Sequence, residues 1–287
     1  MCIRDRVIWW SLGKVVTRQK TIINTFVDWF IKWGLLNCHF IVGKNTQSCH
    51  YYQEKYGVPA NRTLVAPNTI DDIEVQTEIE QNKDDAIVLR KQLNSEAIVL
   101  YVGAMEKTKR LEDLIEAMEN VWDNCPSAKL VLVGGGEIKL DLEKKISEMK
   151  RDGQVIFTGK IFKGVSKYFL AANVFVLPGL GGLAIPHAMI HGLPVIARIA
   201  DGTEKDLVRN GVTGYLLDNN NNKELAEKIL SILTQPELQK EMCTNCKNFM
   251  QTRWNIRLQS EMMHTAIIKA SEVGTVLGKC VKRKEAD

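Results

Sequence analysis

Short apolar segments alternate with segments of helical period from residue 97 onward, and this alternation constrains the fold more than any other feature of the sequence. A short strand that is apolar along its whole length is buried on both faces, which is typical of a parallel sheet covered by helices on each side. The pattern therefore predicts an α/β fold with a doubly wound parallel sheet. The expected strands are residues 97–103, 129–136, 154–159, 173–179, 193–197 and the weaker 213–217, and the expected helices are 110–125, 138–152, 164–172, 184–191 and 222–235.

The region before residue 97 has a different organisation. Residues 38–68 predict one strand–helix–strand unit, and the charged residues 71–95 predict a connector that becomes helical near its end. A complete α/β domain typically takes about 100–150 residues, so we expect residues 1–70 to be the closing part of an incomplete domain. Residues 96–255 then form the larger domain, and residues 256–287 form a C-terminal helix and tail.

Composition narrows the function classes. The chain is 45% hydrophobic and 25% charged with a net charge of +4, which is typical of a globular protein and compatible with an anionic small ligand. This net charge is much smaller than the strongly positive charge typical of domains that bind nucleic acids. The seven cysteines include a lone C-x-x-C at Cys243 and Cys246, with no second pair to complete a zinc set, so we expect reduced thiols.

The N-terminal region is rich in tryptophan. Its most apolar part, residues 22–42, is interrupted by Asn24, Asp28, Lys32 and Asn37, which makes it too polar for a membrane-spanning helix. Two interpretations remain open: a helix in a membrane interface, or a helix whose apolar face packs on other protein elements, which we favour. The first residues, MCIRDR, resemble translated sequencing-adapter read-through, so we expect the natural protein to begin further upstream and this chain to be a fragment.

Six stretches stand in a characteristic order along the chain. They are GVPANRTLVAPNTID (57–71), YVGAMEKTKRLEDLIEAM (101–118), KLVLVGGGE (129–137), VIFTGKI (155–161), FVLPGLGGLAIPHAMIHGLPVIA (175–197) and EKDLVRNGVTGYLL (204–217). In this order they resemble glycosyltransferase family 4, a group of retaining enzymes with the GT-B fold that use nucleotide-sugar donors. The resemblance implies a donor-binding domain at residues 96–255, an incomplete Rossmann-like acceptor domain before it, and a reaction in the cleft between them.

Cleavage of a sugar–diphosphate bond leaves negative charge on the departing phosphate, which the protein must stabilise. The sequence has no Asp-x-Asp triplet to hold a metal, and the pairs Asp71–Asp72 and Asp84–Asp85 are expected to be solvated. We therefore expect a metal-free site without a cofactor, in which Lys109 matches the family lysine that contacts the diphosphate and is the candidate catalytic residue. The alternative for Lys109 is a solvated lysine at the start of a helix.

The family usually has an arginine at the position of Ala104. Lys107 or Arg110 is a weaker candidate for supplying that missing charge. Gly103, just before Ala104, allows close backbone approach to a ligand, although a plain turn explains it equally well.

A glycine-rich turn follows the segment at 173–179. Gly181, Gly182 and Leu183 begin a helix, so their backbone N–H groups are candidates for contacts to phosphate oxygens. The alternative is a tight strand–helix turn that needs a positive φ.

The family commonly has two glutamates eight residues apart across this turn, and Gly179 and His187 stand there instead. A neutral imidazole still offers one donor and one acceptor, so His187 is a candidate for contact with a ribose hydroxyl; the alternative is simple packing. His191 lies one turn later, but with no third ligand nearby a metal site on this pair is not expected.

Three further positions carry weaker expectations. Lys160 and Ile161 match the family stretch whose backbone contacts the base. Glu204 matches a common family glutamate and is a substrate-binding candidate, expected to be structural or to contact the donor loop rather than to act as a general base. Trp254 is expected to anchor the C-terminal helix by burial, and residues 279–284 are expected to be a solvated basic tail.

Together these features predict a hexosyltransferase-type, retaining, metal-independent glycosyltransferase. We expect its partners to be a nucleotide-sugar donor and a saccharide or lipid-linked acceptor, and we expect no nucleic-acid partner. We expect the protein in the cytoplasm, with peripheral contact to the inner membrane surface. A sugar-nucleotide epimerase of the same fold and a non-catalytic nucleotide-sugar-binding relic remain as alternatives.

Overall fold

The computed structural model describes residues 6–11, 22–218 and 220–272. The chain divides into two compact units, and each is described by itself. Unit 1 comprises Met1–Asn68 together with Arg257–Asp287, and unit 2 comprises Thr69–Ile256. Of the adapter-like start, MCIRDR, only Arg6 is among the described residues. The basic tail at 279–284 lies outside them.

Unit 2 contains a six-stranded parallel sheet in the order β6-β5-β4-β7-β8-β9. The chain builds outward from β4 in one direction and then, starting with β7, in the other, as the predicted doubly wound sheet requires. The predicted strands are confirmed with shifts of a few residues at their ends. The strands are β4 (Ile98–Val102), β5 (Lys129–Val133), β6 (Val155–Gly159), β7 (Val174–Leu177), β8 (Val195–Arg198) and β9 (Gly214–Leu217).

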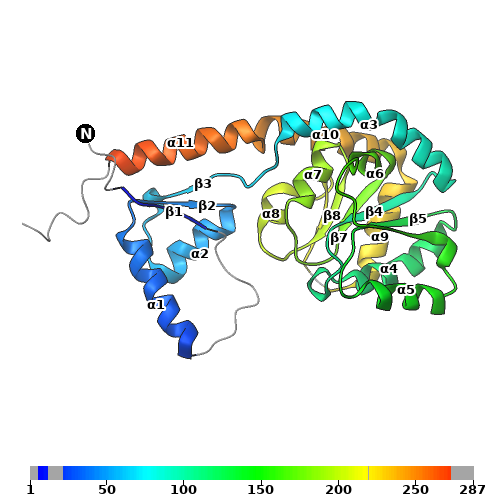
Figure 1. Ribbon diagram of the computed structural model, residues 1–287, viewed down its shortest axis with the longest axis horizontal. Coiled ribbons are helices and arrows are strands. Elements are labelled where there is room, and N and C mark those ends of the chain that lie inside the picture. The colour runs from blue at the N-terminus through cyan, green and yellow to red at the C-terminus, as the bar shows by residue number, and fades with distance from the viewer. Residues whose placement is uncertain (1–5, 12–21, 219, 273–287) are drawn as a thin grey trace, which may run out of the picture. The chain divides into compact units, whose positions relative to one another are not determined.

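Helices cover both faces of this sheet (Figure 1). One layer consists of α4 (Leu111–Asn124), α5 (Lys139–Glu148) and α9 (Asn222–Thr234). The opposite layer consists of α3 (Asp72–Leu93), α6 (Ser166–Ala171), α7 (Ala184–Ile190) and α10 (Pro236–Arg253). Because helices lie on both sides, the central strands are apolar throughout rather than alternating.

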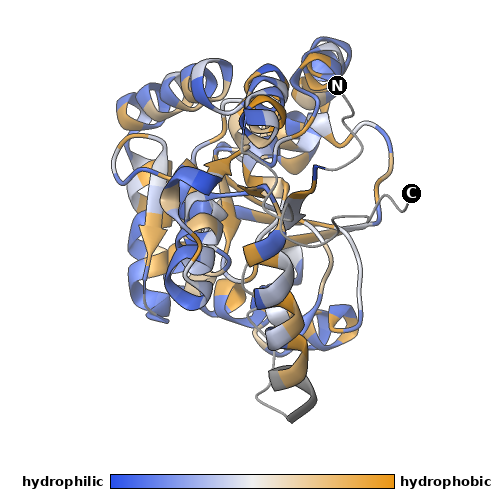
Figure 2. Ribbon diagram, turned by 90° about the vertical axis from the view of Figure 1, so that its left-hand side faces the viewer, coloured by the Kyte–Doolittle hydropathy of each residue, from blue (hydrophilic) through white to orange (hydrophobic). Residues whose placement is uncertain are grey.

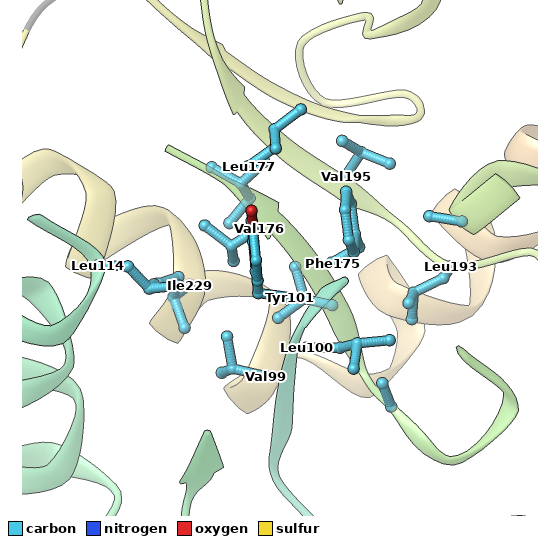
Figure 3. Packing of buried hydrophobic residues seen from close by; sticks show 14 of the residues in the cluster. Val99, Leu100, Tyr101, Leu114, Phe175, Val176, Leu177, Leu193, Val195 and Ile229 are labelled. Atoms are coloured by element: carbon cyan, nitrogen blue, oxygen red, sulfur yellow. The ribbon is translucent and has the colours of Figure 1, made fainter. Parts of the chain in front are cut away.

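The core of unit 2 is centred on β4 and β7. Figure 3 shows Leu100, Tyr101, Phe175 and Val176 of these strands together with Leu114 of α4 and Ile229 of α9. All of these side chains are fully buried. Burial of such apolar strands is the main source of stability for this layer arrangement.

The segment expected as a connector, residues 71–95, is mostly the helix α3 (Asp72–Leu93). Asp71 accepts hydrogen bonds from the N–H groups of Ile73 and Glu74 and so caps the helix. Its buried positions Val75 and Ile79 face α6 and the core. The high charge of this segment concealed a helix that packs against the domain.

Unit 1 contains a three-stranded parallel sheet, β1 (Ile8–Ser11), β2 (Phe40–Gly43) and β3 (Thr63–Val65), in that order. The helices α1 (Ile22–Asn37) and α2 (Thr46–Tyr56) belong with one apolar cluster that includes Leu35 and Ile41. The helix α11 (Ile256–Glu272) contributes Ala266 and Ala270 to a second cluster around Phe40. The C-terminal helix therefore packs within unit 1 rather than within unit 2, which precedes it in the chain.

Among its described residues, unit 2 also contains two short 3-10 turns. They are η3 (Lys107–Lys109) before α4 and η4 (Asp152–Gln154) before β6. A third, η2 (Ala60–Arg62), precedes β3 in unit 1. The predicted burial of Trp254 is confirmed, because this side chain is 5% exposed within the core of unit 2.

Candidate functional site

The winding direction of the sheet in unit 2 reverses between β4 and β7. Ligands of open α/β sheets bind outside the carboxyl ends of the strands at this switch point. The two turns that follow β4 and β7 contain Gly103–Lys109 and Gly179–Leu183. Topology alone therefore brings the principal predicted residues to one edge of the sheet.

The turn after β4 is tied closely to the turn after β5. The N–H of Gly103 donates to the carbonyl of Val133 at 2.9 Å, and the N–H of Met105 donates to that of Gly135 at 3.0 Å. A Cβ at Gly134 would lie 1.9 Å from the oxygen of Gly103. The backbone of the turn after β5 therefore fills space beside Gly103, where the sequence predicted the close approach of a ligand.

Tyr101 braces the same turn and was not singled out from the sequence. Its hydroxyl is buried and donates to the carbonyl of Ala104 at 2.7 Å. Burial raises the pKa of this phenol, so it stays neutral and remains a donor. The available signal was a single phenol in an aliphatic strand, two residues before a glycine.

Lys109 reaches from η3 to the turn after β7. Its Nζ donates to the carbonyl oxygen of Leu180 at 2.7 Å and lies 3.4 Å from that of Gly181. The N–H of Leu180 in turn donates to the carbonyl of Thr108 at 2.9 Å. Lys109 is partly buried here, unlike a solvated lysine at a helix start, and its ammonium lies beside the glycine-rich turn.

The glycines of that turn differ in their surroundings. A Cβ at Gly181 would lie 3.2 Å from the side chain of Leu177, whereas a Cβ at Gly182 would meet no atom within 4 Å. Neither glycine has a positive φ, so the alternative of a turn that demands positive φ is wrong. Leu183, the residue before α7, is 42% exposed.

Lys160 and Ile161 follow β6 at the same edge of the sheet. The aliphatic part of the Lys160 side chain lies over Gly135, because a Cβ there would be 3.4 Å from Lys160 Cγ. Ile161 is partly buried against the core. Contacts between neighbouring turns thus run from Lys160 through the turn after β5 to the turn after β4.

His187 and His191 stack with Phe169 of α6. The ring centroids of His187 and His191 lie 4.7 Å and 4.9 Å from that of Phe169. Both Nε2 atoms are buried without a hydrogen-bond partner. This arrangement is the packing alternative for His187; its predicted contact with a ribose stays a prediction.

Burial also sets the charge state of this pair. Desolvation lowers the pKa of both imidazoles, to about 3 for His191, whose ring nitrogen Nδ1 lies 2.8 Å from the carbonyl oxygen of His187. Glu78 opposes the shift at His187, and Lys247 reinforces it at His191. Both imidazoles are therefore neutral at pH 7.

Glu204 is 1% exposed at the start of α8 (Thr203–Leu207). Its Oε1 accepts hydrogen bonds from the N–H groups of Ala200 at 2.6 Å and Gly202 at 2.9 Å. Burial raises the pKa of this carboxyl, and the backbone donors oppose that shift. These contacts close the turn after β8, in line with the structural alternative for Glu204. Its contact with the donor loop stays a prediction.

The candidates for the missing family arginine lie in different surroundings. Arg110 pairs with Asp113 at 2.5 Å and also bonds Asn220, while Lys107 is exposed. Asp113 is shared with Arg198, a 3% exposed side chain at the end of β8. The charge of Arg110 is thus engaged in joining the turns around β4, β8 and β9.

No group of three or more His, Cys, Asp or Glu side chains among the described residues is arranged to hold a metal ion. Asp71 is exposed, as expected, although it also caps α3; Asp72 is half-buried and accepts a hydrogen bond from the N–H of Ile256. Asp84 and Asp85 are exposed. The cysteines that the structure describes are free thiols, including Cys243 and Cys246.

The family model described as "Glycosyl transferases group 1" matches residues 84–249, more than half of the chain. The chain belongs to this family. It is 29% identical over 212 residues to trehalose synthase from Pyrococcus horikoshii, covering 67% of this chain and 50% of that protein. It is 26% identical over 194 residues to the capsular polysaccharide glycosyltransferase CapM from Staphylococcus aureus, covering 63% of this chain and 49% of that protein. The chain thus spans about half the length of these relatives.

Solved structures agree on the fold. The crystal structure of HepE from Anabaena in complex with UDP matches with a TM-score of 0.75 and 18% identity, covering 91% of this chain and 71% of that chain. Sucrose-phosphate synthase from Thermosynechococcus elongatus matches with a TM-score of 0.70 and 26% identity, covering 90% of this chain and 65% of that chain. The predicted α/β fold of GT-B type is confirmed.

Proposed function

We propose that this chain carries the donor-binding half of a family 4 glycosyltransferase. The whole glycosyltransferase transfers a sugar from a nucleotide-diphosphate donor to an acceptor, with retention at the anomeric carbon and without a metal ion. One observation carries the proposal: the ammonium of Lys109 lies 2.7 Å from the carbonyl oxygen of Leu180, at the switch point of a sheet in a chain that belongs to the glycosyl transferases group 1 family.

The chemistry follows from charge. When the sugar–phosphate bond breaks, its electron pair stays on the departing diphosphate, and fixed positive groups lower the barrier by stabilising that charge. A lysine ammonium has three N–H donors. Lys109 directs two toward Leu180 and Gly181, so the third is available to a phosphate oxygen.

Backbone groups complete the proposed donor site. The N–H groups of Gly181, Gly182 and Leu183 face the phosphates, and the open space beside Gly182 leaves room for one. The backbone of Lys160 and Ile161 contacts the base and Gly103 lines the site. His187 contacts a ribose hydroxyl only after its ring moves off Phe169, because its Nε2 is buried as placed.

The nature of the ligands is supported by similar proteins. HepE was crystallised with UDP. The names of relatives refer to capsular polysaccharide biosynthesis, to a poly(ribitol-phosphate) N-acetylglucosaminyltransferase and to a monoglucosyldiacylglycerol synthase. We propose a hexose donor and a saccharide or lipid-linked acceptor for the whole protein, which acts in the cytoplasm.

The direct test incubates the protein with UDP-glucose and GDP-mannose, with simple sugars and lipid-linked sugars as acceptors, in the presence of EDTA. We expect transfer that persists in EDTA, with the donor's anomeric configuration kept in the product by NMR. Inverted configuration, or activity that EDTA abolishes, would contradict the mechanism. Conversion of the donor without any acceptor would favour the epimerase alternative.

The relic alternative rests on the departures at Ala104, Gly179 and His187. It predicts that UDP or GDP binds but that no acceptor or donor gives turnover. Replacing His187 with glutamate and finding that turnover appears only then would support the relic.

We also propose that α1 contacts a membrane surface. No helix of the described residues is long and apolar enough to cross a bilayer, but Trp29, Phe30 and Trp33 of α1 are each about 60% exposed. Hydrophobic residues mark much of this helix in Figure 2. Exposed tryptophan and phenylalanine on one helix are typical of side chains in the interfacial region of a bilayer.

Vesicles that contain phosphatidylglycerol test this contact by co-sedimentation. We expect the protein to bind them and the double variant Trp29→Ser, Trp33→Ser to lose binding. The control is Phe162→Ser, which removes a 90% exposed aromatic side chain of unit 2. The proposal is contradicted if all three proteins sediment equally with the vesicles, or if the original protein does not sediment with them. Either result would favour packing of α1 against another protein element.

A further inference from the structure

The turns after β4 and β7 are joined by reciprocal contacts, which we call the latch. It consists of the bond from the Leu180 N–H to the Thr108 carbonyl at 2.9 Å and the bond from Lys109 Nζ to the Leu180 carbonyl at 2.7 Å. The two bonds connect residues about seventy positions apart in the chain. They fix η3 against the turn that would hold the phosphates.

The backbone of Gly179 lies close against the backbone of η3. A Cβ at this residue would lie 2.5 Å from the oxygen of Thr108 and 2.6 Å from the carbonyl carbon of Lys109. Real Cβ atoms do not approach backbone this closely, so a side chain would displace η3. Because Gly179 does not have a positive φ, space rather than backbone conformation requires glycine here.

We infer that Gly179 is a positioning residue for the anion-binding turn. Its missing side chain lets η3 dock, and docking holds the Lys109 ammonium beside Leu180 and Gly181. The ligand in this inference rests on the proposed function, whereas the latch itself does not. At this position the resemblance places a glutamate, and the space for its Cβ is filled by the backbone of Thr108 and Lys109.

Glycine at position 179 is thus required for the docking of η3 and is not merely the loss of a side chain. If the position had merely lost a side chain, adding one would be harmless or would restore a contact. In the latched structure, any side chain at 179 opens the link between the two turns. Gly179→Ala is therefore the informative change, and Gly179→Glu is expected to weaken nucleotide binding further instead of restoring it.

Chemical labelling of lysines measures the latch without a ligand. An amine-acylating reagent is applied to the folded protein, and the modification of Lys109 is quantified by mass spectrometry relative to the exposed Lys107. A hydrogen bond to a charged group is typically worth enough to change its opening equilibrium about tenfold, so Gly179→Ala should raise the ratio by about that factor. The control is Gly153→Ala, because a Cβ at Gly153 meets no atom within 4 Å and its φ is not positive.

Calorimetric titration of the same proteins with UDP and with GDP tests whether the latch affects the affinity for the nucleotide. We expect Gly179→Ala to weaken the binding of whichever nucleotide binds by about tenfold, with Gly153→Ala unchanged. An unchanged labelling ratio in a folded Gly179→Ala protein, or raised labelling with undiminished affinity, overturns the inference. If the original protein binds neither nucleotide, the proposed function fails, while the labelling ratio still decides whether the latch exists.

A second variant covers the case in which Gly179→Ala does not fold. Lys109→Met removes the ammonium, and hydrogen exchange then reports on the Leu180 N–H that donates to Thr108. We expect its exchange to accelerate about tenfold, with the amides of β4 unchanged. Unchanged exchange at Leu180 would show that the turns are held together without Lys109 and would overturn the inference.

Discussion

The two units use apolar residues in different ways. In unit 2 helices cover both faces of the sheet, and β4 and β7 bury every side chain except that of Val102, which is half-buried; Phe175 is fully buried. In unit 1 the three-stranded sheet also has helical cover, yet Phe30 on α1 is 62% exposed along with neighbouring aromatics. Because large exposed apolar patches mark interaction sites, the comparison separates residues that hold the fold from residues available to a partner.

Matched phenylalanine substitutions test this comparison with the largest expected effect. Phe175→Ala removes a fully buried ring and should lower the free energy of unfolding of unit 2 by about 3–5 kcal/mol. Phe30→Ala should change stability by less than about 0.5 kcal/mol, as is usual for exposed positions. Urea unfolding followed by circular dichroism measures both; equal losses would remove the distinction between the units.

A smaller effect comes from the buried histidines of unit 2. Because the folded-state pKa values of His187 and His191 lie below the unfolded value of 6.5, the unfolded chain binds protons first as the pH falls. Stability is therefore present above pH 6.5 and is lost below it, down toward the folded pKa of about 3 for His191. The slope is about 1.4 kcal/mol per pH unit for each imidazole.

Unfolding measured at pH 7.5 and 5.5 checks this slope. His191→Phe, which keeps a ring beside Phe169, should flatten the pH dependence, and the exposed His50 of unit 1 serves as the control in His50→Gln. Glu78 faces His187 and Lys247 faces His191. A flat profile in the original protein would show that these imidazoles are not buried as described.

The sequence predicted the sheet well because each central strand is apolar from end to end. It also placed Lys109 near Gly181, since the carboxyl ends of parallel strands meet at one edge. It predicted only the end of residues 71–95 to be helical, whereas α3 spans Asp72–Leu93, with buried Val75 and Ile79 four residues apart in a highly charged segment. Local pattern shows which residues are apolar, but the count of charges hid the helical spacing here.

The contact of Gly179 with η3 was beyond reach of the sequence for another reason. It depends on how two loops, far apart in the chain, meet in space, and neither loop has a pattern that announces it. The same holds for the bond from the Tyr101 hydroxyl to Ala104. Sequence reasoning found the residue types of the site but not the contacts that hold its turns.

The smallest expected effect on stability distinguishes two glycines of one turn. Gly182→Ala places a methyl group in open space and should change stability by less than about 0.5 kcal/mol. The same methyl would occupy the room proposed for a phosphate, so UDP or GDP affinity should fall. Thermal unfolding and calorimetry on the same sample test both statements; unchanged affinity would move the phosphates away from Gly182.

Calorimetric titration of UDP and GDP into the protein and into Lys109→Gln, with EDTA present, tests the central claim most directly. The account predicts that one of the nucleotides binds the original protein and that Lys109→Gln binds it about tenfold more weakly or worse. Binding of equal strength to both proteins, or no binding to the original protein, would contradict the claim that Lys109 and the glycine-rich turn hold a diphosphate.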